Sequence, residues 1–325
     1  MVLRDKNKIN GFSLIEILIG VAIASIMMAA MFASYTVVNN TYSRVTDVAG
    51  ISRSGRDIVS MLMRDIRMAG FKYYYGVFEN SKTDIPKQDY LEFILGDDDD
   101  SKENSHMPVV IYKNTLGYDN IISTSDLTAK LGKNLSLGSE NHTDDPLKVC
   151  CDRIHIVYGD FNANHSNQPY KRYRVTYFAM PVERKIGQNV DQYYAVYKSK
   201  ESWKQELNDG VPEEKGEWVS NCDECYAGEL IREHVVDMEF IALDKNGKTV
   251  NANPAENLEE MFNIRSVDVK LTFRSSSPKG YFAKTQKKIV NSFTSDRSDV
   301  VEVEDRYLRD NIFVTVHTRN IGGPL

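Results

Sequence analysis

The chain has 325 residues, of which 42% are hydrophobic and 26% are charged, and its net charge is −6. An acidic chain of this kind is not expected to present a surface dominated by nucleic-acid binding, and its length allows one large domain or two smaller ones. The sequence contains no HExxH motif, no Gly-x-Ser-x-Gly elbow and no glycine-rich phosphate loop, so it indicates no class of enzyme.

The amino terminus places a glutamate inside an apolar run that follows a short basic leader. Residues 17–33 are mainly apolar, and with Phe12, Leu14 and Ile15 they supply about 20 residues, the length that a bilayer core requires. The basic leader predicts that the amino terminus stays in the cytoplasm and that the bulk of the chain lies outside. Because a lone carboxylate in lipid costs at least a few kcal/mol, Glu16 predicts a cationic partner.

The sequence GFSLIE at residues 11–16 resembles the start of type IV prepilins and of the pseudopilins of type II secretion. The resemblance implies that prepilin peptidase cleaves between Gly11 and Phe12, and that the new amine of Phe12 is N-methylated. It also implies that Glu16 pairs with the terminal amine of a neighbouring subunit in a filament, which would supply the cation.

Two other interpretations of the amino terminus remain open. A secretory signal peptide also has a basic start and an apolar middle, and residues 30–33 before Ser34 could provide a small-residue cleavage site. A simple membrane anchor would explain the apolar length, but it does not explain why Gly11, Phe12 and Glu16 occur together.

The helix is predicted to continue beyond the membrane. Between Val45 and Met68, apolar residues recur at spacings of three, four and seven, and charged residues fill the other face. Gly70 suits the left-handed position after a helix, so we expect a helix over residues 12–69, about 90 Å long. The expected organisation is a leader peptide (1–11), a transmembrane and filament-core helix (12–34), an amphipathic continuation (35–70) and a β-rich periplasmic or extracellular head (71–325).

Two further segments resemble the PilW-like group of minor type IV pilins. One is RDIRMAG at residues 64–70, and the other comprises the strand-like runs at residues 262–274 and 305–320. The resemblance implies a role in pilus assembly or priming, at or near the pilus tip, and in adhesion, twitching motility or DNA uptake. A J-like pseudopilin of a type II secretion system and a membrane-tethered ligand-binding module are the alternatives. The arginines at the helix end indicate either a solvated face or a subunit-docking surface.

The same resemblance implies the partners and the location of the protein. The partners are prepilin peptidase, other minor and major pilins, and the assembly platform of the inner membrane. The chain is expected as a single-pass protein of the inner membrane with its head in the periplasm, and then in the pilus at the cell surface. No set of residues presents a nucleophile with its base, so no enzymatic activity is predicted, and no cofactor is predicted either.

The remainder of the chain predicts an antiparallel β-sheet. Alternating residues over 172–178 and 266–273 are typical of a sheet with one buried face, on which the helix would pack. The sequence DKNGK at residues 244–248 predicts a hairpin turn, because Asn-Gly accepts positive φ. The predicted fold class is therefore α+β and pilin-like. Strands are expected at residues 91–95, 109–112, 153–158, 170–180, 192–197, 235–243, 267–273 and 312–316, with long polar insertions at residues 96–107, 132–145, 198–217 and in part of 275–304.

Four cysteines form two close pairs. Cys150 and Cys151 are adjacent, and two residues separate Cys222 from Cys225. Outside the cytoplasm disulfides are favoured, and because a bond between adjacent cysteines is strained, pairing across the two pairs is an alternative. Four thiolates in two pairs could instead bind zinc.

Two weaker candidate sites remain. The acidic run of Asp97, Asp98, Asp99 and Asp100 offers oxygen ligands for calcium, although it lacks the spacing of an EF-hand loop. Residues 279–288 interleave lysines with Tyr and Phe, which are the minimal requirements for binding single-stranded DNA.

Overall fold

The computed structural model describes residues 12–71, 107–113, 135–137, 151–161, 170–186, 189–208, 211–253, 263–279, 286–290 and 301–321. The chain divides into two compact units, Met1–Gly50 and Ile51–Leu325. The long helix α1 (Leu14–Met68) contributes its first part to one unit and its last part to the other.

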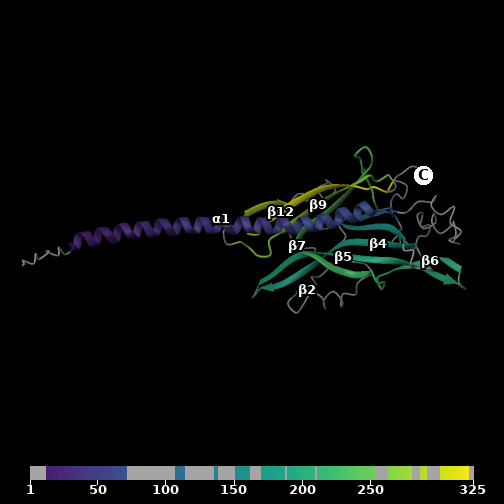
Figure 1. Cartoon of the computed structure of the whole chain (residues 1–325), viewed down its shortest axis with the longest axis horizontal. Coiled ribbons are helices and arrows are strands. Elements are labelled where there is room, and N and C mark those ends of the chain that lie inside the picture. Colours follow the sequence, from purple (N-terminus) through teal and green to yellow (C-terminus); the bar gives the residue numbers. More distant parts are fainter. Residues whose placement is uncertain are drawn as a thin grey trace, which may run out of the picture. The chain divides into compact units, whose positions relative to one another are not determined.

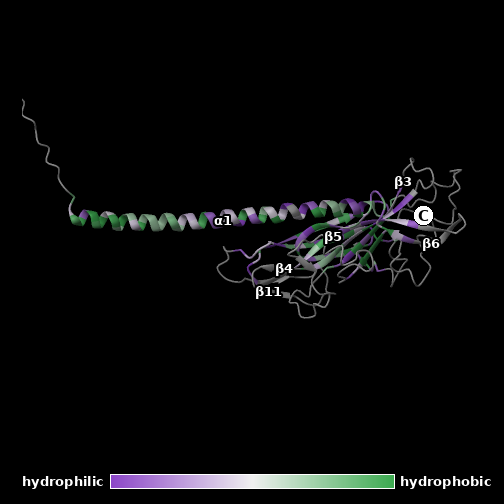
Figure 2. Cartoon of the chain, turned by 90° about the horizontal axis from the view of Figure 1, so that it is seen from below, coloured by the Kyte–Doolittle hydropathy of each residue, from purple (hydrophilic) through white to green (hydrophobic). Residues whose placement is uncertain are grey.

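The first unit is the apolar part of α1, shown as a regular helix in Figures 1 and 2. One 18-residue window of this part is apolar enough to cross a membrane, and none of that window is buried. Four hydroxyl groups, those of Ser25, Thr36, Thr41 and Thr46, donate to carbonyl oxygens of their own helix, such as Ser25 Oγ to Val21 O at 2.7 Å. This part of α1 therefore presents an apolar surface without free hydroxyl donors at these positions.

The second unit contains the last part of α1 and the strands. The strands are β1 (Val109–Tyr112), β2 (Leu135–Leu137), β3 (Arg153–Phe161), β4 (Tyr170–Ile186), β5 (Asn189–Asn208), β6 (Val211–Val219), β7 (Tyr226–Leu243), β8 (Thr249–Val250), β9 (Ser266–Arg274), β10 (Gln286–Val290), β11 (Val301–Asp305) and β12 (Arg309–His317).

The described strands form one large sheet and one small one. The large sheet has the order β1-β3-β4-β5-β7-β9-β12, and β2, β6 and β8 pair with β4, β5 and β7 respectively. Strands β10 and β11 form a separate two-stranded sheet. Every pairing is antiparallel. The predicted fold class, a long amino-terminal helix followed by an antiparallel sheet, is confirmed.

The last part of α1 buries one stripe of side chains against the large sheet. The buried side chains recur at helical spacing, and they share a core with inward-facing residues of the strands. From the helix these are Ile51, Ile58, Val59, Leu62, Ile66 and Ala69, and from the strands they include Val175, Val196, Phe240, Leu271 and Phe273. The apolar face of the amphipathic part of α1 therefore packs on the sheet of the same unit.

The middle strands bury both of their faces, whereas alternation predicted one. In β9, Val269 and Leu271 lie in the core with the helix, yet the intervening Lys270 is only 3% exposed. Its ammonium lies 3.7 Å from Asp237 Oδ2 and 3.8 Å from Glu239 Oε2. Polar residues alternate here because ion pairs, not water, satisfy the charges of the second face.

Every predicted strand within the described residues is part of an observed strand, and residues 91–95 lie outside them. The expected insertion at residues 198–217 is wrong, because it forms the end of β5 and most of β6. Trp203 and Trp218 lie opposite each other there, with ring centroids 5.3 Å apart. Such a cross-strand aromatic pair stabilises a hairpin whose other residues are mostly polar.

The insertion expected within residues 275–304 also contains strands, because β10 and the start of β11 lie in it. The hairpin turn predicted at residues 244–248 is confirmed. Gly247 has a φ of 76°, and its N–H donates to the carbonyl oxygen of Asp244 at 3.1 Å. Strands β7 and β8 pair on either side of this turn.

Candidate functional site

The amino-terminal motif forms a capping box at the start of α1. The N–H of Ser13 donates to Glu16 Oε2 at 3.0 Å, and the N–H of Glu16 donates to Ser13 Oγ at 3.2 Å. The two residues thus satisfy each other's backbone groups ahead of the first helical residue, Leu14. The carboxylate also lies at the positive end of the helix dipole.

This geometry gives Glu16 a partner within its own chain. The sequence predicted a cationic partner, and in the described residues the carboxylate instead accepts a hydrogen bond from a backbone amide. Both residues are exposed, as is Phe12, whose side chain is 84% exposed. Gly11 lies outside the described residues, so the cleavage site between Gly11 and Phe12 and the pairing of Glu16 with an amine stay predictions.

The far end of α1 carries a buried carboxylate that fastens the helix to the sheet. Asp65 Oδ2 lies 2.7 Å from Lys198 Nζ and accepts a hydrogen bond from the hydroxyl of Tyr177 at 2.6 Å. Tyr177 and Lys198 lie directly opposite each other on β4 and β5. Burial, followed by the charge of Asp65, raises the pKa of Tyr177 far above its usual value. The tyrosine therefore stays a donor to the carboxylate.

The end of α1 also meets the end of the described chain. Gly70 has a φ of 69°, as predicted for the residue after a helix, and its N–H donates to Val157 O at 2.9 Å. Asn320 Nδ2 donates to the carbonyl oxygen of Arg67 at 3.1 Å. The two segments that resemble PilW-like pilins, residues 64–70 and the carboxy-terminal runs, thus contact each other.

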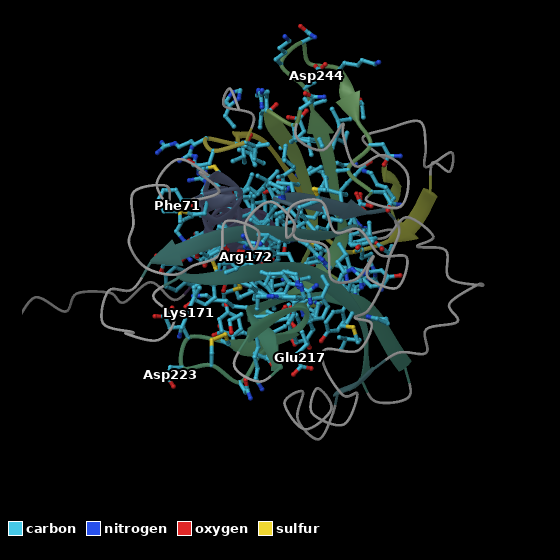
Figure 3. All side chains as sticks on the ribbon, turned by 90° about the vertical axis from the view of Figure 1, so that its right-hand side faces the viewer. Phe71, Lys171, Arg172, Glu217, Asp223 and Asp244 are labelled. Atoms are coloured by element: carbon cyan, nitrogen blue, oxygen red, sulfur yellow. A yellow bond between two sulfur atoms is a disulfide. The ribbon has the colours of Figure 1, made fainter. Side chains whose placement is uncertain are left out.

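The cysteines form one disulfide among the described residues. Cys222 and Cys225 are bonded, with their Cα atoms 4.9 Å apart, in a turn where the N–H of Cys225 donates to Cys222 O at 2.9 Å. Figure 3 shows this turn beside Asp223. Cys151 is buried and makes no disulfide, and Cys150 lies outside the described residues. Pairing across the two pairs and a four-thiolate zinc site are both contradicted, because two of the thiols are bonded to each other.

The remaining candidate sites lie wholly or largely outside the described residues. Asp97, Asp98, Asp99 and Asp100 fall outside them, as do residues 280–285 of the basic and aromatic segment. Within the described part of the chain, no three His, Cys, Asp or Glu side chains gather where they could hold a metal ion.

Sequence reasoning missed two of the residues that shape these sites. Ser13 could have been found, because Ser-Leu-Ile-Glu at residues 13–16 has the Ser-x-x-Glu pattern of a capping box. Lys198 offered no such signal, because it is remote from Asp65 in sequence and lies in a segment that was expected to be an insertion.

The chain combines a prepilin-like amino-terminal sequence, an apolar helix of membrane length and an antiparallel sheet, and this arrangement is similar to that of type IV pilins. The family model described as the prokaryotic N-terminal methylation motif matches residues 6–32. Among solved structures, the chain is similar to a type IV-like pilin from Thermus thermophilus, with 14% sequence identity and a TM-score of 0.25, over 62% of this chain and 95% of that chain. No curated protein matches the chain.

Proposed function

We propose that this chain is a minor type IV pilin of the PilW-like group that joins a filament through its amino-terminal helix. The single observation that carries the proposal is the geometry at residues 12–16. There a carboxylate is held at the exposed end of an apolar helix, next to the residue that would carry the new amine. The methylation motif over residues 6–32 supports the same proposal.

The proposed sequence of events begins in the inner membrane. Residues 12–34 hold the chain there as a single-pass protein, with residues 71–325 forming the head in the periplasm. Prepilin peptidase then cleaves between Gly11 and Phe12, and the new amine is methylated. Glu16 pairs with the amine of a neighbouring pilin, because a charge-assisted hydrogen bond relieves the cost of a carboxylate in an apolar surrounding.

The proposed partners are other minor and major pilins, prepilin peptidase and the assembly platform of the inner membrane. The chain would sit at or near the pilus tip and prime assembly, and so act in adhesion, twitching motility or DNA uptake. The contact between Arg67 and Asn320 supports the PilW-like assignment, because it brings together the two segments that resemble this group. The proposal assigns the chain no catalytic role.

The first test is the mature amino terminus, determined by mass spectrometry of the full-length protein from native membranes with and without prepilin peptidase. We expect a chain that begins at N-methylated Phe12 only when the peptidase is present. An intact Met1, or a start at Ser34, would overturn the filament proposal in favour of an anchor or an exported domain.

A second measurement separates a pilus from a secretion filament. Sheared surface pili should contain the processed chain, and deletion of the gene should reduce piliation. Loss of protein secretion with normal piliation would instead identify a J-like pseudopilin. A third measurement deletes the polar insertions of the head. If the filaments stay normal but ligand capture is lost, the binding-module alternative is favoured.

A further inference from the structure

The last part of α1 presents a stripe of arginines on the face turned away from its own sheet. We call this set the arginine stripe: Arg53, Arg56, Arg64 and Arg67. All four side chains are exposed, and so are Asp57 and Ser60 between them. Spacings of three, eight and three residues place the arginines along one side of the helix over about 21 Å.

Among the described residues, the arginine stripe has almost no partners. Within that part of the chain, the one ion pair of its members is between Arg64 Nε and Asp65 Oδ1, at 3.4 Å. The Arg64 side chain is 71% exposed, and Asp65 is already paired with Lys198 at 2.7 Å. Among the described residues, no acid lies within ion-pair distance of Arg53, Arg56 or Arg67. No described residue of the chain therefore neutralises these three charges.

Local helix physics explains only half of the stripe. Arg67 lies in the last turn of α1, where a cation is favourable to the helix dipole, and Arg64 lies just before that turn. Arg53 and Arg56 are far from the helix end, so the dipole gives them no advantage. Each arginine also has a like charge three residues away, which disfavours the helix. The dipole therefore does not explain why Arg53 and Arg56 lie on this face, and the like-charge spacing opposes it.

We propose that the arginine stripe docks against an acidic face of a different pilin-class subunit. Guanidinium groups suit carboxylates because they donate two parallel hydrogen bonds, and arginine is enriched at protein interfaces. Helix α1 contains no lysine over Leu14–Met68, so its cations are all arginines, which fits recognition rather than general solubility. That the partner is a pilin rests on the proposed function, whereas its acidic character rests on the stripe alone.

Other occupants fit the stripe less well. The same helix face of a second copy would place arginines against arginines, with only Asp57 to oppose them. A nucleic acid would meet Asp57 in the middle of the stripe, and the stripe offers no aromatic side chain on which bases could stack. A protein surface can match the pattern, because it can place a cation opposite Asp57 and acids on either side.

The experiment uses full-length protein in native membranes with a photoreactive benzophenone amino acid in place of Ser60, which lies between the arginines. The crosslinked partner is identified by mass spectrometry. The charge-reversal variant carries Arg56→Glu and Arg64→Glu. The matched control carries Lys245→Glu and Lys248→Glu, an equal change in net charge on the exposed turn after β7. Thermal unfolding of both variants shows whether the head is intact.

We expect a crosslink to an acid-rich segment of another pilin-class protein. The charge-reversal variant should reduce it at least tenfold, the control should not, and reversing the partner's acids to arginine should restore it. An undiminished crosslink in the charge-reversal variant, or a crosslink to a second copy, nucleic acid or lipid, would overturn the proposal.

Processing at Phe12, measured in the same cells, separates this proposal from the proposed function. No crosslink from a processed chain that is present in filaments would overturn the docking surface and leave the pilin proposal standing. An unprocessed chain that is absent from filaments would overturn the proposed function, and the pilin-class partner with it.

Discussion

The two parts of α1 differ in whether their apolar and acidic side chains are exposed or buried. In the first unit, Leu18 is 61% exposed and Met28 is 72% exposed, whereas in the second unit Leu62 and Ile66 are fully buried. The two acids differ in burial and in partners. Glu16 is exposed and bonded to a backbone amide, whereas Asp65 is buried and bonded to two side chains. The first part therefore leaves its apolar surface and its carboxylate exposed, and the second uses its apolar side chains and its carboxylate to hold the head together.

The largest expected effect comes from changing the exposed acid. Glu16→Gln keeps an oxygen that can accept from the Ser13 amide, so the capping box survives, but the charge is lost. If an amine is the partner in the filament, incorporation into sheared pili should fall at least tenfold while membrane insertion is unchanged. Immunoblots of pili and membranes from the same cells measure the ratio.

Ser13→Ala is the matched control for this change. It removes the hydroxyl that accepts from Glu16 N–H and costs about 1 kcal/mol of helix stability, but it keeps the carboxylate. Incorporation should therefore fall much less than in Glu16→Gln. Equal losses in the two variants would show that capping, and not the charge, is what the filament needs.

Changing the buried acid should affect stability and not incorporation directly. Asp65→Ala leaves the ammonium of Lys198 buried without its partner and removes the acceptor of Tyr177, so we expect a loss of about 3–5 kcal/mol in the free energy of unfolding. Urea unfolding of the detergent-solubilised full chain, followed by tryptophan fluorescence, measures this value.

The double variant Asp65→Leu with Lys198→Met tests whether the loss comes from a stranded charge. Two apolar side chains of similar size leave no unpaired ion, so the part of the loss that comes from the stranded charge should return, whereas the hydroxyl of Tyr177 still lacks its acceptor. A loss below about 1 kcal/mol in Asp65→Ala would contradict the anchoring role, since breaking a buried ion pair costs more than that.

The difference between the two acids explains which features the sequence could predict. Local patterns predicted the helix and the turn at Asp244, and the Ser-x-x-Glu pattern could have predicted the capping box, because every interacting group lies within a few residues. Alternation gave the strands of the sheet for the same reason. The partners of Asp65 could not be predicted, because Tyr177 and Lys198 become its neighbours only when β4 and β5 pair.

The second buried face and strand β6 were missed for a related reason. Lys270 and its partners Asp237 and Glu239 are charged, and polar residues at alternate positions predict exposure unless their partners are known. Strand β6 contains charged residues that are typical of a loop, and only the pairing of Trp203 with Trp218 shows why it extends the sheet. Both errors concern interactions between segments that are distant in the sequence.

Two glycines of α1, Gly50 in the first unit and Gly55 in the second, differ in the space around them. A Cβ at Gly55 would lie 2.4 Å from Ile312 Cδ1 and 3.0 Å from Phe273 Cε2, whereas a Cβ at Gly50 would meet nothing within 4 Å. Gly50→Ala should stabilise the helix by about 1 kcal/mol. Gly55→Ala should be about 1–3 kcal/mol less favourable than Gly50→Ala, because overpacking opposes the gain.

Thermal unfolding of the two alanine variants checks this difference. Adding Ile312→Val to Gly55→Ala removes the Cδ1 atom that the new methyl group meets, so part of the loss should return. Equal stabilisation by both single variants would show that the helix does not approach β9 and β12 closely at Gly55.

The smallest effect is expected from the disulfide. Cys222 and Cys225 close a very short loop, so chain entropy assigns the bond at most about 2 kcal/mol. The double variant Cys222→Ala, Cys225→Ala keeps the ion pair of Glu224 with Lys200, at 3.2 Å, on the same turn. Reductant should lower the melting temperature of the natural chain by a few degrees and have no effect on the double variant.

Cys151→Ala should keep the full response to reductant, because Cys151 is not disulfide-bonded. Loss of that response in Cys151→Ala would show that the two cysteine pairs are bonded to each other.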